Sequence, residues 1–537
     1  MIGVTLDRDS NVPLYLQITA QIREAILQGK LDNSERLTPE RRLAALLNVN
    51  RTTVVNAYRE LASEGLVTGH VGRGTIVTYQ RPAPQTLPDG ANAPGQSDRG
   101  SSDAGSNAGS RLPWRHLLAP PADFRYDSLI LDASTVAARP DVIRFTTATP
   151  APELYPLRQI DSILSEALET AGRELLQHTP SEGFAPLLDA LSGWMNEQAL
   201  GAGLPSAFDA SDILVASGSQ QALYLTARAL VEPGDVVAIE SPTYLGAAQV
   251  FRVCGARLLS IPVDRDGMNV DLLSEVISRR RPKLIYTLPT FQNPTGSVMA
   301  LERRKRLLEL AGRYQIPIIE DDPYGALRYE GTPLPTLAAL DRARGGDRVI
   351  YLSTMSKVLF PGFRIGWVAG PRAVLDRLAQ IKQIVDLDTN ALVQWAVWAF
   401  LSRGLLKEHL ETLAQAYPAR LNRMVEGLER HGGGLISVDR PQGGLYLWCR
   451  LADHLRVRDL LVESAREGIA FAPGEPFFID EPSEAGRNTL RLNFTLPSLD
   501  EIDEGTRRMG RALDQLAAQA GDDRNRENKR RSITPIV

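Results

Sequence analysis

The stretch STMSKVLFPGFRIGW, residues 353–367, places a lysine in a turn rich in hydroxyl side chains, with an arginine seven residues later. A lysine that forms an imine with an aldehyde has to keep some neutral amine, so it needs a special local environment. The hydroxyl groups of Thr354 and Ser356 and the guanidinium of Arg364 suit a phosphate close to that lysine. The stretch therefore predicts that Lys357 carries an aldehyde cofactor with a phosphate group, although a lysine after a serine is by itself common on protein surfaces.

Upstream of this turn, IPIIEDDPYGAL (316–327) has an apolar run that ends in acidic residues. Such a run predicts a buried strand, and α/β folds place ligand groups at the carboxyl ends of their strands. A carboxylate in that position can hold the proton on a cofactor ring nitrogen. Asp321 and Asp322 are both candidates, and the alternative role for either acid is a helix N-cap.

Three more segments end strands with polar groups. LIYTLPTFQNPTG (284–296) brings Asn293 after a strand, and ILVASGSQQAL (213–223) leads from a strand through a Gly-Ser turn into a helix, whose free N–H groups can bind an anion. In TLRLNFTLP (489–497), Arg491 lies among apolar residues, so we expect a buried anionic partner. That partner is either a substrate carboxylate, gripped by two hydrogen bonds, or an internal Asp or Glu.

Taken in order, these segments resemble the class I/II aminotransferases, which are fold-type I enzymes dependent on pyridoxal 5′-phosphate (PLP), over about residues 140–515. The resemblance implies a fold over 125–518 with an α/β/α large domain, a mixed and mostly parallel sheet, and a small α+β domain. The implied cofactor-binding residues are Ser219, Gln220, Tyr244, Asn293, Asp321, Tyr324, Thr354, Ser356, Lys357 and Arg364.

Within that set, Lys357 would bind the cofactor covalently, and the Asp-x-x-Tyr pattern of the family selects Asp321 as the partner of the ring nitrogen. With Tyr324 these two residues would be catalytic, and Arg491 would bind the α-carboxylate of an amino acid. One position departs from the family. Where a tyrosine usually reaches the phosphate of the partner subunit, this sequence has His178.

The N-terminal 80 residues have a different pattern. Apolar residues at helical spacing predict a helix over 13–28, and a second helix is predicted over 39–47 with Thr38 as its N-cap. A short turn then leads to RTTVVNAYRELASEGL, residues 51–66, which completes a helix-turn-helix. The following LVTGHVGRGTIVT predicts a β-hairpin wing with Gly72-Arg73-Gly74 at its tip.

Charge supports DNA as the partner of this module. Between Arg36 and Arg59 there are five arginines and one acid, in a chain whose net charge is −4. Recognition helices reach bases and phosphates with their N-terminal residues. The alternative is a solvated basic hairpin without a nucleic-acid partner. The module resembles the winged helix of the GntR family over roughly residues 12–79, which implies DNA contacts at Arg41, Arg51, Thr52, Thr53, Gly72 and Arg73.

The rest of the chain sets limits on function. Residues 81–124 are predicted to be a flexible linker, since 81–112 are rich in Gly, Ser, Pro, Asp and Asn, and the basic tail 519–537 is predicted to be disordered. The two cysteines, Cys254 and Cys449, have no metal-ligand spacing, so we expect neither a metal site nor a disulfide framework. No run is long and apolar enough to span a membrane, and we expect a cytoplasmic protein.

A GntR-like winged helix, a linker and an aminotransferase-like domain together resemble the MocR subfamily. The resemblance implies a transcriptional regulator that binds promoter DNA, is a homodimer and senses an amino acid, an amine or PLP through aldimine exchange at Lys357. Two other hypotheses stay open because a fold does not fix a function. One is a working aminotransferase that acts on an amino acid and a 2-oxo acid, and the other is a different PLP reaction such as decarboxylation.

Overall fold

The computed structural model describes residues 4–8, 13–27, 30–33, 35–63, 66–70, 74–78, 128–146, 149–479 and 484–531. The predicted linker, residues 81–124, lies outside the described residues. The chain divides into two compact units, residues 1–120 and 121–537.

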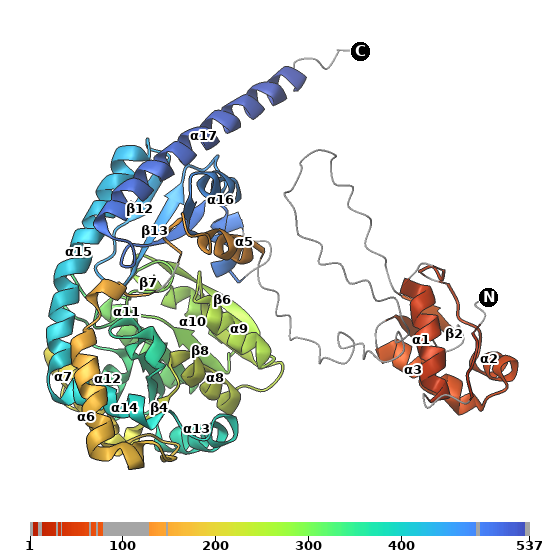
Figure 1. The fold of residues 1–537 in the computed structure, drawn as a ribbon, viewed down its shortest axis with the longest axis horizontal. Helices are drawn as coiled ribbons and strands as arrows, with labels where there is room; N and C mark the ends of the chain where they lie inside the picture. Colours follow the sequence, from red (N-terminus) through yellow and green to blue (C-terminus); the bar gives the residue numbers. More distant parts are fainter. Residues whose placement is uncertain are drawn as a thin grey trace. The chain divides into compact units, whose positions relative to one another are not determined.

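The N-terminal unit is a winged helix-turn-helix, as predicted (Figure 1). Its apolar core includes Ile18 and Ile22 from the first helix and Val54 and Leu61 from the third. Two short strands pair antiparallel after the third helix and form the sides of the wing. The elements are α1 (Leu14–Leu27), α2 (Glu40–Leu47), α3 (Arg51–Ser63), β1 (Val67–His70) and β2 (Gly74–Val77).

The start of α2 differs from the prediction by one residue. Pro39, and not Thr38, occupies the N-cap, because its ψ of 138° is extended and helical geometry begins only at Glu40. The carbonyl of Thr38 instead accepts a hydrogen bond of 2.6 Å from the hydroxyl of Tyr58. At the other end, α2 stops at Asn48, whose left-handed backbone (φ 50°) makes the sharp turn into α3.

The large domain of the second unit is built on an eight-stranded sheet in the order β4-β11-β10-β9-β8-β5-β6-β7. Five consecutive strands, from β10 to β6, run parallel, whereas β11 and β7 are antiparallel to their neighbours. The predicted mixed and mostly parallel sheet is therefore confirmed. The strands are β4 (Ile213–Ala216), β5 (Val236–Ser241), β6 (Arg257–Asp264), β7 (Gly267–Met268), β8 (Leu284–Thr287), β9 (Ile318–Asp321), β10 (Val349–Thr354) and β11 (Gly366–Ala369).

Helices cover both faces of this sheet, so its central strands are buried on both sides. Alternate residues of one strand enter different cores, as a period of two requires: Leu214 packs with one face and Val215 with the other. On the Leu214 face lie α8 (Ser219–Leu230), α9 (Leu245–Val253) and α13 (Arg372–Val385). On the other lie α6 (Leu157–Leu175), α7 (Ala185–Gly201), α10 (Val270–Arg279), α11 (Leu301–Tyr314), α12 (Leu337–Arg342) and α14 (Ala391–Ser402).

The small domain is an antiparallel sheet, β12-β13-β16-β15, with helices packed on it. Its long helices α15 and α17 run side by side (Figure 1). The strands of this sheet are β12 (Ile436–Asp439), β13 (Tyr446–Leu451), β15 (Ala472–Pro473) and β16 (Thr489–Asn493), whereas β3 (Ile143–Arg144) and β14 (Ile469–Ala470) pair parallel in a separate two-stranded sheet. The helices are α5 (Ser128–Ala137), α15 (Leu405–His431), α16 (Val457–Arg466) and α17 (Leu499–Arg531).

The helix α17 corrects one prediction. It continues to Arg531, so residues 519–531 are helical where the sequence predicted disorder, and 532–537 lie outside the described residues. The first half of α17 is anchored by buried Ile502 and Leu513. Extending an existing helix requires no new nucleation, and the Ala, Gln, Glu, Lys and Arg that follow are good helix formers.

A glycine in β11 allows the close approach of the strand and the start of α8. A Cβ on Gly366 would lie 2.5 Å from the backbone nitrogen of Ser219 and 2.8 Å from the carbonyl oxygen of Ser353. We expect Gly366→Ala to lower the free energy of unfolding by about 1–3 kcal/mol, because only backbone could move to relieve the overlap. Chemical denaturation would measure the change.

The matched control is Gly370→Ala just beyond the same strand. There the nearest atoms, all from Ile350, would be 3.7–3.8 Å from the new Cβ, which is ordinary van der Waals contact. This variant should stay within about 0.5 kcal/mol of the wild type. Equal losses in the two variants would contradict the proposed role of Gly366.

Candidate functional site

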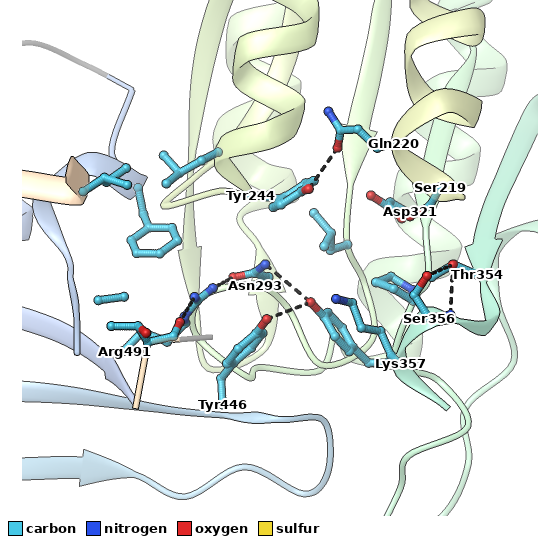
Figure 2. Close-up of a pocket in the computed structure, with 18 of the residues that line it drawn as sticks. Ser219, Gln220, Tyr244, Asn293, Asp321, Thr354, Ser356, Lys357, Tyr446 and Arg491 are labelled. Atoms are coloured by element: carbon cyan, nitrogen blue, oxygen red, sulfur yellow. Dashed lines mark hydrogen bonds between the residues drawn. The ribbon is translucent and has the colours of Figure 1, made fainter. Parts of the chain in front are cut away.

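A cavity of about 310 Å³ lies between the large and the small domain of the second unit. Every residue that the sequence predicted for the cofactor and for the substrate carboxylate lines it, and most are labelled in Figure 2. Those residues are Ser219, Gln220, Tyr244, Asn293, Asp321, Tyr324, Thr354, Ser356, Lys357, Arg364 and Arg491. The structure thus brings together side chains that are spread over most of this unit.

One side of the cavity offers donors for an anion. Ser219 begins α8, so the first N–H groups of that helix have no partner within it. Arg364 lies nearby, donating from Nη1 to the Ser356 hydroxyl over 3.4 Å and from Nη2 to a backbone carbonyl over 3.2 Å. The backbone of Arg364 is left-handed (φ 55°), and Gly218 leaves room for its guanidinium, since a Cβ there would lie 2.4 Å from Nη2. These groups could hold a phosphate.

Lys357 ends a 3₁₀ turn (Met355–Lys357) directly after β10. The Thr354 hydroxyl fixes the turn, because it accepts from the Ser356 backbone nitrogen over 3.1 Å. Burial lowers the pKa of Lys357, and the positive charges of Arg491 and Arg364 lower it further. Lys357 therefore has more neutral amine at a given pH than an exposed lysine, which is the form that attacks an aldehyde.

The two neighbouring acids at the end of β9 have different environments. Asp321 lines the cavity, and its Oδ2 accepts a hydrogen bond of 2.6 Å from Tyr286, whereas its buried Oδ1 has no partner among the described residues. Burial raises the pKa of Asp321 to about 7. Asp322 does not line this cavity, and it accepts from the Gly325 backbone nitrogen and the Tyr351 hydroxyl. Asp321 is therefore the acid with capacity left for the protonated nitrogen of a bound ring.

Hydrogen bonds join the middle of the cavity wall. The Tyr324 hydroxyl donates to Tyr446 over 3.3 Å and accepts a long bond of 3.5 Å from the amide of Asn293. Tyr244 donates to Gln220 over 2.9 Å, and burial raises the pKa of Tyr244 to about 12. Burial also raises the pKa of Tyr324, so Tyr244 and Tyr324 could contact a ring and its oxygen without adding charge to the site.

Arg491 is buried in β16 beneath two aromatic rings. Its guanidinium carbon lies 4.0 Å from the ring centre of Tyr446 and 5.0 Å from that of Phe477. Nη1 donates to Asn293 over 2.7 Å and Nη2 donates to the Thr146 carbonyl over 3.1 Å. Its Nε is buried without a partner, and within the described residues no Asp or Glu forms a salt bridge with it. Among the described residues the internal salt bridge is therefore not formed, and the buried Nε leaves the arginine with capacity for an outside anion.

Several cavity residues were missed by the sequence reasoning. Tyr446, Phe477 and Thr146 come from segments with no recognisable motif, and α5 adds three more residues to the wall. The hydrogen bond from Tyr286 to Asp321 could have been inferred from the sequence, because both residues stand near the ends of adjacent parallel strands. His178 does not line the cavity; its Nδ1 lies 2.9 Å from Asp388, and its side chain is exposed.

In the N-terminal unit, the predicted DNA-contacting residues that are described are reachable from solvent. Arg51 and Thr52 are exposed at the first turn of α3, and Thr53 is half-buried. Arg51 donates to Glu40 over 3.0 Å with about half of its side chain exposed, and Arg41 is exposed on α2. Gly72 and Arg73 lie outside the described residues.

Within the described parts of the chain, no group of three or more His, Cys, Asp or Glu side chains could hold a metal ion. No helix within them has both the length and the apolar character needed to span a bilayer.

Comparison with known proteins identifies both parts of the chain. Residues 153–509 match the family described as aminotransferase class I and II, and residues 14–77 match bacterial regulatory proteins of the gntR family. The fold resembles that of LysN, the α-aminoadipate aminotransferase of Thermus thermophilus, solved with N-(5′-phosphopyridoxyl)-L-leucine. That match has a TM-score of 0.70 and 35% identity over 76% of this chain and 100% of LysN.

Two regulators match nearly the whole chain. The HTH-type transcriptional regulator YisV of Bacillus subtilis strain 168 is 32% identical, over 93% of this chain and 95% of its own length. The probable rhizopine catabolism regulatory protein MocR of Rhizobium meliloti is 30% identical, over 90% of this chain and 91% of its own length. With a GntR-type winged helix in front of a PLP-dependent aminotransferase-like domain, this chain belongs to the MocR-like transcriptional regulators of the GntR family.

Proposed function

We propose that the cavity around Lys357 senses an amino acid or an amine and that the winged helix converts its binding into a change in promoter occupancy. The observation that carries the proposal is the set of unsatisfied groups in one cavity. Asp321 Oδ1 and Arg491 Nε are both buried and lack partners among the described residues, and the side chains of Asp321 and Arg491 line the same cavity as Lys357.

Each unsatisfied group matches one part of a cofactor and ligand. When bound, PLP supplies an aldehyde that condenses reversibly with an amine and a ring that withdraws electrons. We assign its phosphate to Ser219, Gln220, Thr354, Ser356 and Arg364. Asp321 would hold the proton of the ring nitrogen, Tyr244 would lie against the ring, and Asn293 and Tyr324 would donate to the ring oxygen.

The ligand would occupy the remaining space. A carboxylate on Arg491 would satisfy Nε and bring the adjacent amine toward Lys357. A ligand amine can then compete with Lys357 for the cofactor, which releases the lysine to act as a neutral base. Such exchange could change DNA binding only if two arrangements of the protein bind the ligand with different affinity.

The test uses the full-length protein loaded with PLP. Amino acids and amines would be titrated while the visible absorbance of the cofactor and the affinity for DNA from the protein's own promoter region are followed together. A ligand that changes both signals over the same concentration range supports sensing. Spectral changes without any change in DNA affinity would refute it.

We assign DNA contact to Arg41, Arg51, Thr52, Thr53, Gly72 and Arg73. We expect Arg51→Ala to weaken binding to the promoter fragment by about tenfold and to lower the slope of log affinity against log salt by about one, because one phosphate contact is lost. Fluorescence anisotropy at several salt concentrations would measure both quantities.

The matched control for Arg51 is Arg59→Ala on the same helix. Arg59 is also exposed, but it lies two turns further from the N-terminus of α3. Its replacement should have a clearly smaller effect on affinity and salt slope. If both variants bind DNA like the wild type, α3 does not contact DNA through its first turn.

We also propose that the protein forms a homodimer through the large domain. Ile384 and Leu387, near the end of α13, are 87% and 53% exposed, and Leu176 is 69% exposed. The hydrogen bond between His178 and Asp388 brings the segment after Leu176 next to the one after α13, so this region of the surface has exposed apolar residues on two neighbouring segments. Such regions on a protein surface favour association. Analytical ultracentrifugation tests the proposal, and a monomer at micromolar concentration would contradict it.

Transamination is the second candidate function. The observation that favours it is the complete set of polar groups around the cavity, including a basic lysine and a carboxylate-binding arginine. Incubation with an amino acid and a 2-oxo acid, followed by assay of the new amino acid, distinguishes a working aminotransferase from a regulator that only senses its ligand. Rapid turnover, combined with a DNA affinity that does not change when the ligand is added, would favour the aminotransferase function.

A further inference from the structure

Part of the cavity wall is not used by any role assigned above. It consists of Ile130, Ala133 and Ser134 from α5, Leu245 from α9, Pro473 from β15 and Phe477, which we call the side-chain wall. The charged residues among those that line the cavity are Asp321, Lys357, Arg364 and Arg491, and each of them already has a proposed partner. The side-chain wall itself contains no charged residue.

The chemistry of the side-chain wall is almost entirely apolar. Ala133, Pro473 and Phe477 are buried, and Leu245 is half-buried. The one polar side chain is the hydroxyl of Ser134, which is exposed at the mouth of the cavity. Two acids lie close to the wall in sequence, and neither lines the cavity: Asp132 is exposed on α5, and Glu475 is held by Arg458 in a salt bridge.

The position of Arg491 directs a ligand toward this wall. Its guanidinium lies 5.0 Å from the ring centre of Phe477, so a carboxylate bound there brings the neighbouring carbon close to the wall. The amine of the same carbon must face Lys357, and the third substituent is left to contact the apolar residues. A second carboxylate or an ammonium placed there would lose water without gaining a partner of opposite charge.

We propose that the side-chain wall selects α-amino acids with an uncharged, apolar side chain and disfavours dicarboxylic and dibasic ones. This inference rests on the proposed function, since it takes Arg491 as the carboxylate site. It names the class of effector for a regulator, or the class of substrate for an enzyme, from the same residues.

The experiment titrates the full-length protein carrying PLP with L-leucine, L-phenylalanine, L-glutamate and L-lysine, and follows the absorbance of the cofactor. We expect the two apolar amino acids to bind at least about tenfold more tightly than the two charged ones. Affinity for glutamate or lysine equal to that for leucine would overturn the inference.

A substitution on α5 tests the location of the wall. Ser134→Arg would place a guanidinium at the mouth, where an exposed residue can be changed without disturbing the core, and it should raise the affinity for glutamate relative to leucine by about tenfold. The matched control is Thr135→Arg, the next residue of α5, which is also exposed but does not line the cavity. If the ratio of glutamate affinity to leucine affinity stays unchanged in Ser134→Arg, or changes equally in both variants, α5 is not part of the side-chain wall.

Different results would contradict the proposed function and the role of the side-chain wall. If no amino acid alters the spectrum although the cofactor band is present, ligand exchange at Lys357 is wrong, and the inference falls with the proposed function. If amino acids alter the spectrum but the charged ones bind as tightly as the apolar ones, only the inference about the side-chain wall is wrong. Should Ser134→Arg lose the cofactor band, the comparison of the four amino acids on the wild-type protein still decides the class of ligand.

Discussion

Lys357→Ala should abolish covalent attachment of the cofactor and, with it, the visible absorbance band of the protein loaded with PLP. Lys357 is the one lysine among the described residues that line the cavity, so no other cavity residue can take its place. Without it, PLP can be held only by phosphate and ring contacts. Borohydride reduction followed by mass measurement would detect a fixed cofactor in the wild type and none in the variant.

Two further measurements would test the assignment of Lys357 without relying on the loss of the absorbance band in Lys357→Ala. Lys305→Ala, on an exposed face of α11 and paired with Glu302, should keep the full band and the full mass increase after reduction. The lowered pKa of Lys357 has its own consequence: apoprotein should capture PLP efficiently at a pH where an exposed lysine is still almost fully protonated. Fixation of PLP by the Lys357→Ala variant at the wild-type level would show that another lysine carries the cofactor.

The sequence was sufficient for the parts of the site that local patterns encode. Lys357, Asp321 and Arg491 each stand in or at the end of a short strand with apolar neighbours, and the structure places all of them on one cavity. For Asp321 and Lys357 this works because the carboxyl ends of parallel strands meet at one edge of a sheet, so residues distant in sequence share a site once the topology is known. Arg491 lies instead in the antiparallel strand β16 of the small domain, and only the family resemblance connected it with the other two.

What the sequence left out depends on contacts across long separations. Tyr446 is 122 residues from Tyr324, and nothing in its own surroundings reveals that their hydroxyl groups meet. Phe477 likewise follows a short strand of two residues, and its position over Arg491 results from how the small domain packs. The helix α17 was missed past residue 518 because composition alone does not show that a charged stretch continues a helix that is already anchored.

The difference between Asp321 and Asp322 shows the same limit at short range. Adjacent residues of a strand point to opposite faces, so only one of the two can face the cavity. A family pattern selected Asp321, but the physical reason appears only in the structure. Both carboxylate oxygens of Asp322 accept hydrogen bonds, one from Gly325 in the loop after β9 and one from Tyr351 in β10. Asp321 keeps one buried oxygen without a partner among the described residues.

Arg491→Ala should weaken the binding of α-amino acids by about 10- to 100-fold, while leaving the binding of the corresponding amines almost unchanged. A charge-assisted hydrogen bond contributes about 1.5–3 kcal/mol, and an amine without a carboxylate cannot form one with Arg491. Phenylalanine and phenethylamine make a suitable pair, because they differ only in the carboxylate. Titration of the cofactor absorbance with each compound would give the two ratios of variant to wild-type affinity.

The contrast between acid and amine separates a binding role from a structural one. Loss of Arg491 also removes its hydrogen bonds to Asn293 and Thr146. If that loss disturbed the whole cavity, the affinity for both compounds would fall together. Arg491→Lys keeps the charge but loses the two-pronged geometry, and it should recover only part of the affinity for phenylalanine. Arg450 is an exposed arginine on the neighbouring strand β13, and Arg450→Ala should change the affinity for neither compound. If phenethylamine loses as much affinity as phenylalanine in Arg491→Ala, the arginine supports the cavity without binding a carboxylate, and the effector would then be sought among simple amines.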